Sequence, residues 1–97
     1  MVEKFYDETE RVNVRFIGFM TDEARYDFGV VYTHLFFGKP LVICMQTGRS
    51  TLLDLKDLED LEHLQKLFNL PSKSNASELA SFLTDAFPMI PFETQYE

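Results

Sequence analysis

The sequence contains no tryptophan, one cysteine, four glycines and four prolines. Its single cysteine, Cys44, cannot form an intramolecular disulfide, which favours a reducing compartment and predicts a cytoplasmic protein. No apolar run approaches the length of about 18–20 residues that a membrane-spanning helix requires, and the acidic first residues lack the apolar core of a signal peptide. The chain therefore predicts neither a disulfide-stabilised secreted domain nor a membrane protein.

Positive charge is also scarce, because nine Lys and Arg residues stand against 16 Asp and Glu, for a net charge of −7. Such a chain repels phosphates, so we expect no nucleic-acid partner and no attachment to anionic membranes. Residues 1–53 carry six basic and seven acidic side chains, whereas residues 54–97 carry three and nine. The first half is thus nearly neutral and holds every arginine, and it is where we expect a partner to bind.

The chain length of 97 residues fits a single domain over 1–97, and an apolar fraction of 45% supplies one core. Residues 1–10 are polar and predict an extended lead-in. Apolar residues then alternate with period two over 12–20 and 25–33, which predicts two antiparallel strands. With residues 22–24 as the loop, the expected pairs place the apolar side chains on one face: Met20–Tyr26, Gly18–Phe28, Phe16–Val30 and Val14–Tyr32.

Further strands are predicted at 41–45 and 50–53, joined by a turn that contains Gly48. Because the connections are short, an antiparallel meander in sequential order is the simplest topology. A change of period after the fourth strand predicts two helices, so the expected fold class is α+β, a four-stranded antiparallel meander sheet followed by two C-terminal helices (ββββαα).

Leucine recurs every three residues from Leu52 to Leu70, a step that would place leucine all around one continuous helix. A helix capped by Asp57 resolves this, because the buried stripe is then limited to Leu58, Leu61, Leu64 and Phe68. The second helix is expected to start at an Asn75 cap, with Glu78 completing a capping box. Pro88 and Pro91 end it, and the apolar tail 89–92 is expected to pack on the body or on a partner.

Candidate catalytic and metal-binding residues are few. His34 and His63 lie too far apart in the sequence to have a metal-ligand spacing, and Cys44 lies mid-strand as a buried thiol. The sequence has no phosphate-binding glycine loop and no nucleophile elbow. We therefore expect no metal, no cofactor and no enzymatic activity.

Two candidate binding surfaces remain. Arg49, with Lys39 and His34, could hold a small anionic ligand between the 32–39 loop and the Gln46–Arg49 turn, although Arg49 is more simply an ordinary turn residue. The second face of the sheet is expected to present Arg15, Ile17, Phe19 and Val31. This face is covered either by the C-terminal helix or tail or by another subunit. The second explanation predicts a homodimer.

The stretch VNVRFIGFMTDEARYDFGVVYTHLFFGKPLVICMQTGRSTLL resembles a small domain-of-unknown-function family of cytosolic proteins from Gram-positive bacteria. The likeness is clearest over residues 11–53, and its most specific part is GKPLVICMQTGRS, residues 38–50. The resemblance implies a bacterial, cytoplasmic protein and brings no activity, cofactor or site residue. The function that we expect is therefore that of a non-enzymatic protein-interaction or accessory domain that self-associates, with an anionic-ligand-binding regulatory module as the alternative.

Overall fold

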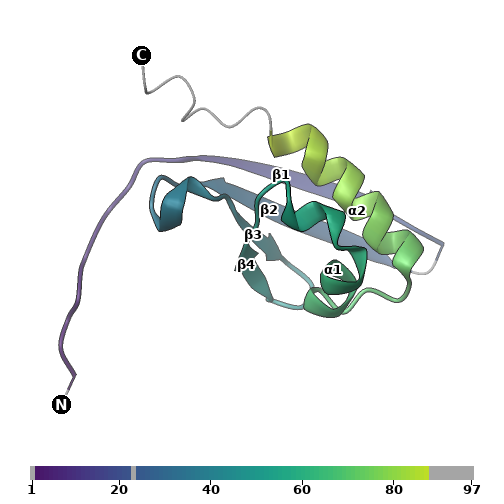
Figure 1. Ribbon diagram of the computed structural model, residues 1–97, viewed down its shortest axis with the longest axis horizontal. Coiled ribbons are helices and arrows are strands. Elements are labelled where there is room, and N and C mark those ends of the chain that lie inside the picture. Colours follow the sequence, from purple (N-terminus) through teal and green to yellow (C-terminus); the bar gives the residue numbers. More distant parts are fainter. Residues whose placement is uncertain (1, 23, 88–97) are drawn as a thin grey trace.

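The computed structural model describes residues 2–22 and 24–87. Its four strands form one antiparallel sheet in the order β1-β2-β3-β4, and both α-helices follow the sheet in sequence. The strands are β1 (Asn13–Met20), β2 (Arg25–Tyr32), β3 (Leu41–Cys44) and β4 (Ser50–Leu52), and the helices are α1 (Leu61–Leu67) and α2 (Lys73–Ala86). Short 3-10 turns occur at η1 (Phe36–Gly38) and η2 (Asp57–Glu59). The predicted α+β meander is confirmed (Figure 1), whereas the tail 89–92 lies outside the described residues.

The pairing of β1 with β2 differs by one residue from the expected register. Phe19 lies opposite Tyr26, and Arg15 lies opposite Val30. The hairpin also closes one pair beyond Met20, because the Thr21 N–H donates to the Ala24 carbonyl at 2.8 Å. The predicted three-residue loop and the four pairs built on it are therefore wrong.

The cause of this error is that β1 is apolar on both faces, so its alternation permits two registers. In the observed register Phe19 turns toward α2, and its ring centre lies 4.9 Å from that of Phe82. Ile17 shares this face and packs against the buried core. The slip therefore exchanges which apolar residues of β1 the helices cover.

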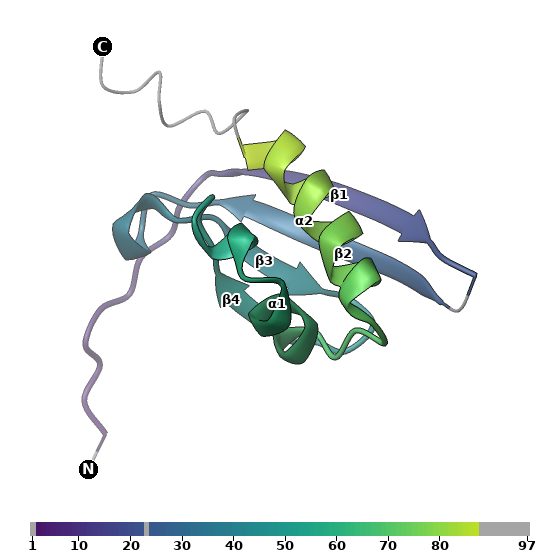
Figure 2. The same cartoon turned by 45° about the vertical axis from the view of Figure 1, so that its right-hand side comes forward.

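The core lies between the sheet and the two helices, which occupy the same side of the sheet (Figures 1 and 2). Phe28 and Phe68 are both fully buried and meet edge to face, with ring centres 5.2 Å apart. At the far end of α2 the Tyr32 hydroxyl donates to the Ala86 carbonyl at 3.1 Å, and burial raises the pKa of this tyrosine. Ala76 and Ala86 are fully buried, so α2 approaches the sheet through small side chains.

Helix α1 starts later than expected. Asp60 caps it, since its Oδ1 accepts from the His63 N–H at 3.1 Å. Asp57, the expected cap, instead exchanges two hydrogen bonds with Asp54, each between a backbone N–H and a carboxylate oxygen. Of the expected leucine stripe, Leu64 is fully buried and Leu61 is half-buried.

Helix α2 begins with Ser72 as its cap rather than Asn75. The Ser72 hydroxyl oxygen accepts from the Asn75 N–H at 3.2 Å, a typical N-cap bond. Asn75 therefore lies inside the first turn and is buried. The predicted cap was wrong because serine and asparagine are both good caps and stand three residues apart, so the sequence signal allows either start.

Candidate functional site

The sheet face opposite the helices has no covering element among residues 2–22 and 24–87, as Figure 2 shows. The β1 side chains on this face are exposed: 44% for Val14, 73% for Phe16 and 75% for Met20. The pairing of β1 with β2 and of β2 with β3 places every second residue of these neighbouring strands on the same face. We call this surface the open face and define it by Val14, Phe16, Gly18, Met20, Arg25, Asp27, Gly29, Val31, Leu41, Ile43, Met45, Ser50 and Leu52.

Phe16 lies midway along β1 on the open face. A Cβ added at Gly29 would lie 3.4 Å from Cε1 of Phe16, so the ring rests directly over the glycine backbone. Gly29 is buried by this contact, while the outer surface of the Phe16 ring stays accessible to solvent. The result is a large apolar surface that its own chain leaves uncovered.

A hydrogen-bonded polar group closes one end of the open face. The Asp27 carboxylate accepts from Gln46 Nε2 at 2.7 Å and from Arg25 Nε at 3.1 Å. These bonds, that from Gln46 first, lower the pKa of Asp27. The carboxylate also explains Gly18, because a Cβ there would lie 2.8 Å from Asp27 Oδ1. Asp27 is thus satisfied within the chain, and apart from Arg25 and Ser50 the rest of the face is apolar.

The expected interface residues are divided between the two faces. Ile17 and Phe19 lie on the face that α2 covers, and Arg15 lies opposite Val30 on that same face. Val31 lies on the open face. The expected grouping of these residues on one face is therefore wrong. Of the two expected coverings, the C-terminal helix covers Ile17 and Phe19, while Arg15 is exposed, and a role for these residues at an interface stays a prediction. Sequence reasoning missed Val14, Phe16 and Met20, whose only signal was that residues 12–20 are apolar on both faces.

The three residues expected to bind an anion do not converge. Lys39 precedes β3 and forms an ion pair with Asp54 at 3.5 Å, whereas Arg49 follows β3 at its opposite end. Arg49 Nη1 instead donates to the carbonyls of Lys66 and Leu67, at 3.0 and 3.3 Å. Arg49 therefore adds a charged donor to carbonyls at the C-terminus of α1, one of which, that of Lys66, also accepts from the Asn69 N–H at 3.4 Å.

His34 lies in a loop that holds residues in unusual backbone conformations. Its N–H donates to Glu10, whose other carboxylate oxygen accepts from the Thr33 hydroxyl; these bonds, that from Thr33 first, lower the pKa of Glu10. Phe36 and Phe37 have φ of 54° and 66°, a left-handed conformation that bulky residues rarely adopt. Phe37 is 98% exposed. The loop therefore ties the segment before β1 to the sheet and presents one aromatic ring to solvent.

Replacing Arg49 by alanine should lower the free energy of unfolding by about 1 kcal/mol, because a charged donor to two helix-end carbonyls is lost at an exposed site. Urea denaturation of the two proteins measures this difference. Lys73→Ala is the matched control, since the exposed Lys73–Glu62 pair spans 3.9 Å and should contribute within about 0.5 kcal/mol. Equal stability of Arg49→Ala and the unsubstituted protein would contradict the capping role.

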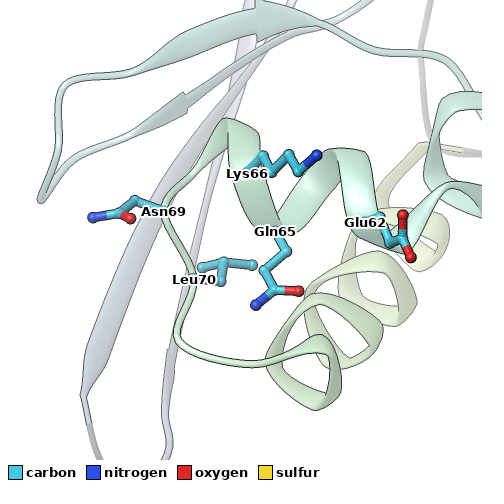
Figure 3. Close-up of a pocket in the computed structure, with 5 residues that line it drawn as sticks. All are labelled: Glu62, Gln65, Lys66, Asn69 and Leu70. Atoms are coloured by element: carbon cyan, nitrogen blue, oxygen red, sulfur yellow. The ribbon is translucent and has the colours of Figure 1, made fainter.

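A surface hollow lies beside α1. It is lined by Glu62, Gln65, Lys66, Asn69 and Leu70. Figure 3 shows these side chains pointing in different directions, so they do not converge on one ligand. One carboxylate and one ammonium group offer no net charge to select a ligand. The hollow is therefore an ordinary surface depression and not a candidate binding site.

Chemistry-bearing side chains are likewise dispersed. Cys44 is fully buried. Within the described ranges no three His, Cys, Asp or Glu side chains are grouped to hold a metal ion. No helix in that part of the chain is long and apolar enough to cross a membrane.

A search of curated proteins found no match to this chain. A family model, by contrast, matches residues 5–85. This range includes the four strands and both α-helices, except for the last residue of α2. The protein therefore belongs to the SAV0927-like family, a small family of unknown function.

Proposed function

We propose that this protein is a non-enzymatic interaction domain that self-associates through the uncovered side of its sheet. The observation that carries the proposal is the exposure of Phe16 and Met20, about three-quarters each, on a face that no described element covers. Contiguous apolar surfaces of this kind mark interaction sites more often than scattered single residues do. The single buried thiol fits a reducing environment, so the proposal is for a cytoplasmic protein.

The magnitudes permit association. With Val14 and Met45, which is 55% exposed, the open face presents on the order of 400 Å² of apolar surface, at about 150–200 Å² for a large side chain. Burying it on two copies contributes about 20 kcal/mol at about 25 cal/mol per Å². The loss of translational and rotational freedom costs about 4–15 kcal/mol. Ordering of interface side chains and desolvation of polar groups add to this cost, so the apolar area permits association without setting its affinity.

The charge distribution also favours the open face as the interface between two copies. Both helices, which carry the acidic residues Glu62, Glu78 and Asp85, lie on the opposite side of the sheet, and the carboxylate on the open face, that of Asp27, pairs with Arg25. Two copies that meet at the uncovered side therefore bring together their nearly neutral halves. The net charge of −7 opposes association less there than it would at the helices.

The test compares two phenylalanines of equal chemistry. Phe16→Asp should weaken the dimer by about 100-fold or more, because a carboxylate would replace a central aromatic contact. Phe37→Asp adds the same charge at a residue that is 98% exposed and lies in η1, outside the sheet, so it should leave the dimer intact. Sedimentation equilibrium over a wide concentration range gives all three association constants. A monomer at every concentration, or equal effects of the two substitutions, would contradict the proposal.

The alternative, an anionic-ligand module, has less support. It requires Arg49 and Lys39 to act together, but the two side chains bond to different elements at opposite ends of β3.

A further inference from the structure

β1 is an end strand of the sheet, and no strand among the described residues pairs with its outer edge. Edge strands of natural proteins are usually protected by charged side chains, proline or a bulge. β1 has the sequence NVRFIGFM, with one charge and no proline, and its pairing with β2 is continuous over eight residues. Its edge therefore has few of the usual defences against pairing with another strand.

The direction of the β1 backbone groups follows from two observed hydrogen bonds. The Thr21 N–H points toward β2, since it donates to Ala24. On β2, the carbonyl of Asp27, which lies opposite Gly18 of β1, points away from β1 and toward β3, since it accepts from the Met45 N–H. Backbone direction alternates along an antiparallel strand, so the odd-numbered residues of β1 bond to β2. The outer edge therefore presents the N–H and C=O groups of the even-numbered residues: Val14, Phe16, Gly18 and Met20.

We propose that a second copy of this chain pairs with that edge, β1 against β1, antiparallel and related by a two-fold axis at Ile17. The inference rests on the self-association in the proposed function, and it places the contact at the β1 edge of the open face, so that only the part of that face along β1 lies next to the partner. This register pairs every outward residue of one copy with an outward residue of the other: Val14 with Met20, Phe16 with Gly18, Gly18 with Phe16 and Met20 with Val14. Shifting it by one pair in either direction leaves an outward residue without an outward partner. The two four-stranded sheets then form one continuous sheet.

The side chains fit this register on both faces. On the open face, Phe16 of one copy lies opposite Gly18 of the other; the Phe16 ring stays over Gly29 of its own chain, and the Asp27 carboxylate lies over Gly18. On the helix side, Phe82 is 39% exposed beside Phe19 at the β1 edge, so the α2 helices of the two copies would meet there. Arg15 of one copy would face Phe19 of the other. Glu78 and Asp85, four residues before and three after Phe82, supply opposite charge on that helix.

A disulfide at the axis tests the register. In the proposed dimer the two Ile17 Cα atoms form a non-hydrogen-bonded pair, about 4.5 Å apart, which is within the range that a disulfide spans. Ile17→Cys, with the buried Cys44 replaced by alanine, should therefore form a covalent dimer upon mild oxidation. Val14→Cys in the same background is the control, because its two Cα atoms would lie about 20 Å apart along the strands and should not cross-link. In a dimer that stacks the open faces, the Ile17 side chains point away from each other.

A second substitution removes an edge hydrogen bond without touching the bonds of β1 to β2. Val14→Pro deletes an outward N–H, so it should weaken the dimer by about 10-fold relative to Val14→Ala, while urea denaturation gives similar monomer stability for both. Cross-linking at residue 17 together with this loss supports edge pairing. If sedimentation shows a dimer that neither cross-links at residue 17 nor weakens with Val14→Pro, edge pairing is wrong and the proposed function stands. If the unsubstituted protein is a monomer, both are wrong.

Discussion

Phe28→Ala should lower the free energy of unfolding by about 3–5 kcal/mol, which is a large part of the total stability of a small domain. Phe28 is fully buried on β2, and its ring is surrounded by aromatic rings from both sides of the core. Its centre lies 5.2 Å from that of Phe68, 6.1 Å from that of Phe19 and 6.4 Å from that of Tyr26. Alanine would remove these contacts and leave a cavity that the strands cannot close.

Urea denaturation followed by circular dichroism measures the loss at Phe28. Phe37→Ala is the matched control, because the same atoms are removed from a side chain that is 98% exposed, and it should change stability by less than about 0.5 kcal/mol. A double substitution of Phe28 and Phe68 should be less destabilising than the sum of the single ones, since the edge-to-face pair is lost only once. Similar stabilities for Phe28→Ala and Phe37→Ala would contradict the placement of the core.

Leu64→Ala should lower the free energy of unfolding by about 2–5 kcal/mol. Leu64 is fully buried in α1, the helix that packs beside α2. This leucine is part of the core that the helices and the sheet share, and its helix has seven residues, too few to be stable without tertiary contacts. We expect the transition in urea to shift to lower concentration with a similar slope.

Leu55→Ala provides the comparison for Leu64. Both leucines belong to the same three-residue series, but Leu55 is 52% exposed in the turn after β4. Its replacement should change the free energy of unfolding by less than about 1 kcal/mol, because little apolar surface is buried there. If the two substitutions were equally destabilising, α1 would not lie with Leu64 toward the core.

Much of the architecture could be predicted from local patterns. Period-two alternation placed the first two strands within one residue of their observed ends, and the turn at Gly48 separated the next two. The change of period after β4 predicted two helices, and Leu64 and Phe68 were correctly expected in the core. These features depend on neighbours in sequence, so local chemistry was sufficient to find them.

The candidate site was harder to predict. Arg49 looked like an anion-binding residue because a turn arginine beside glycine is usually exposed, but the C-terminus of α1 lies within reach and accepts both of its hydrogen bonds. Residues 49 and 66 are distant in the sequence, and no local pattern reports their contact. The open face escaped prediction for a related reason, since it depends on which face of β1 the helices cover.

The amino-acid sequence by itself determined that this chain has one small core and a meander of four strands followed by two helices. Alternation, turns and the leucine repeat act locally, so they are visible in the sequence. Only the tertiary structure decided the register of β1, since Ile17 and Phe19 compete with Phe16 and Met20 for the same core and both sets are apolar. The rings of Phe28 and Phe82 lie on the helix side and pack with Phe19, which leaves Phe16 uncovered. That single choice between two nearly equal faces creates the open face and the β1 edge through which we propose that the protein associates.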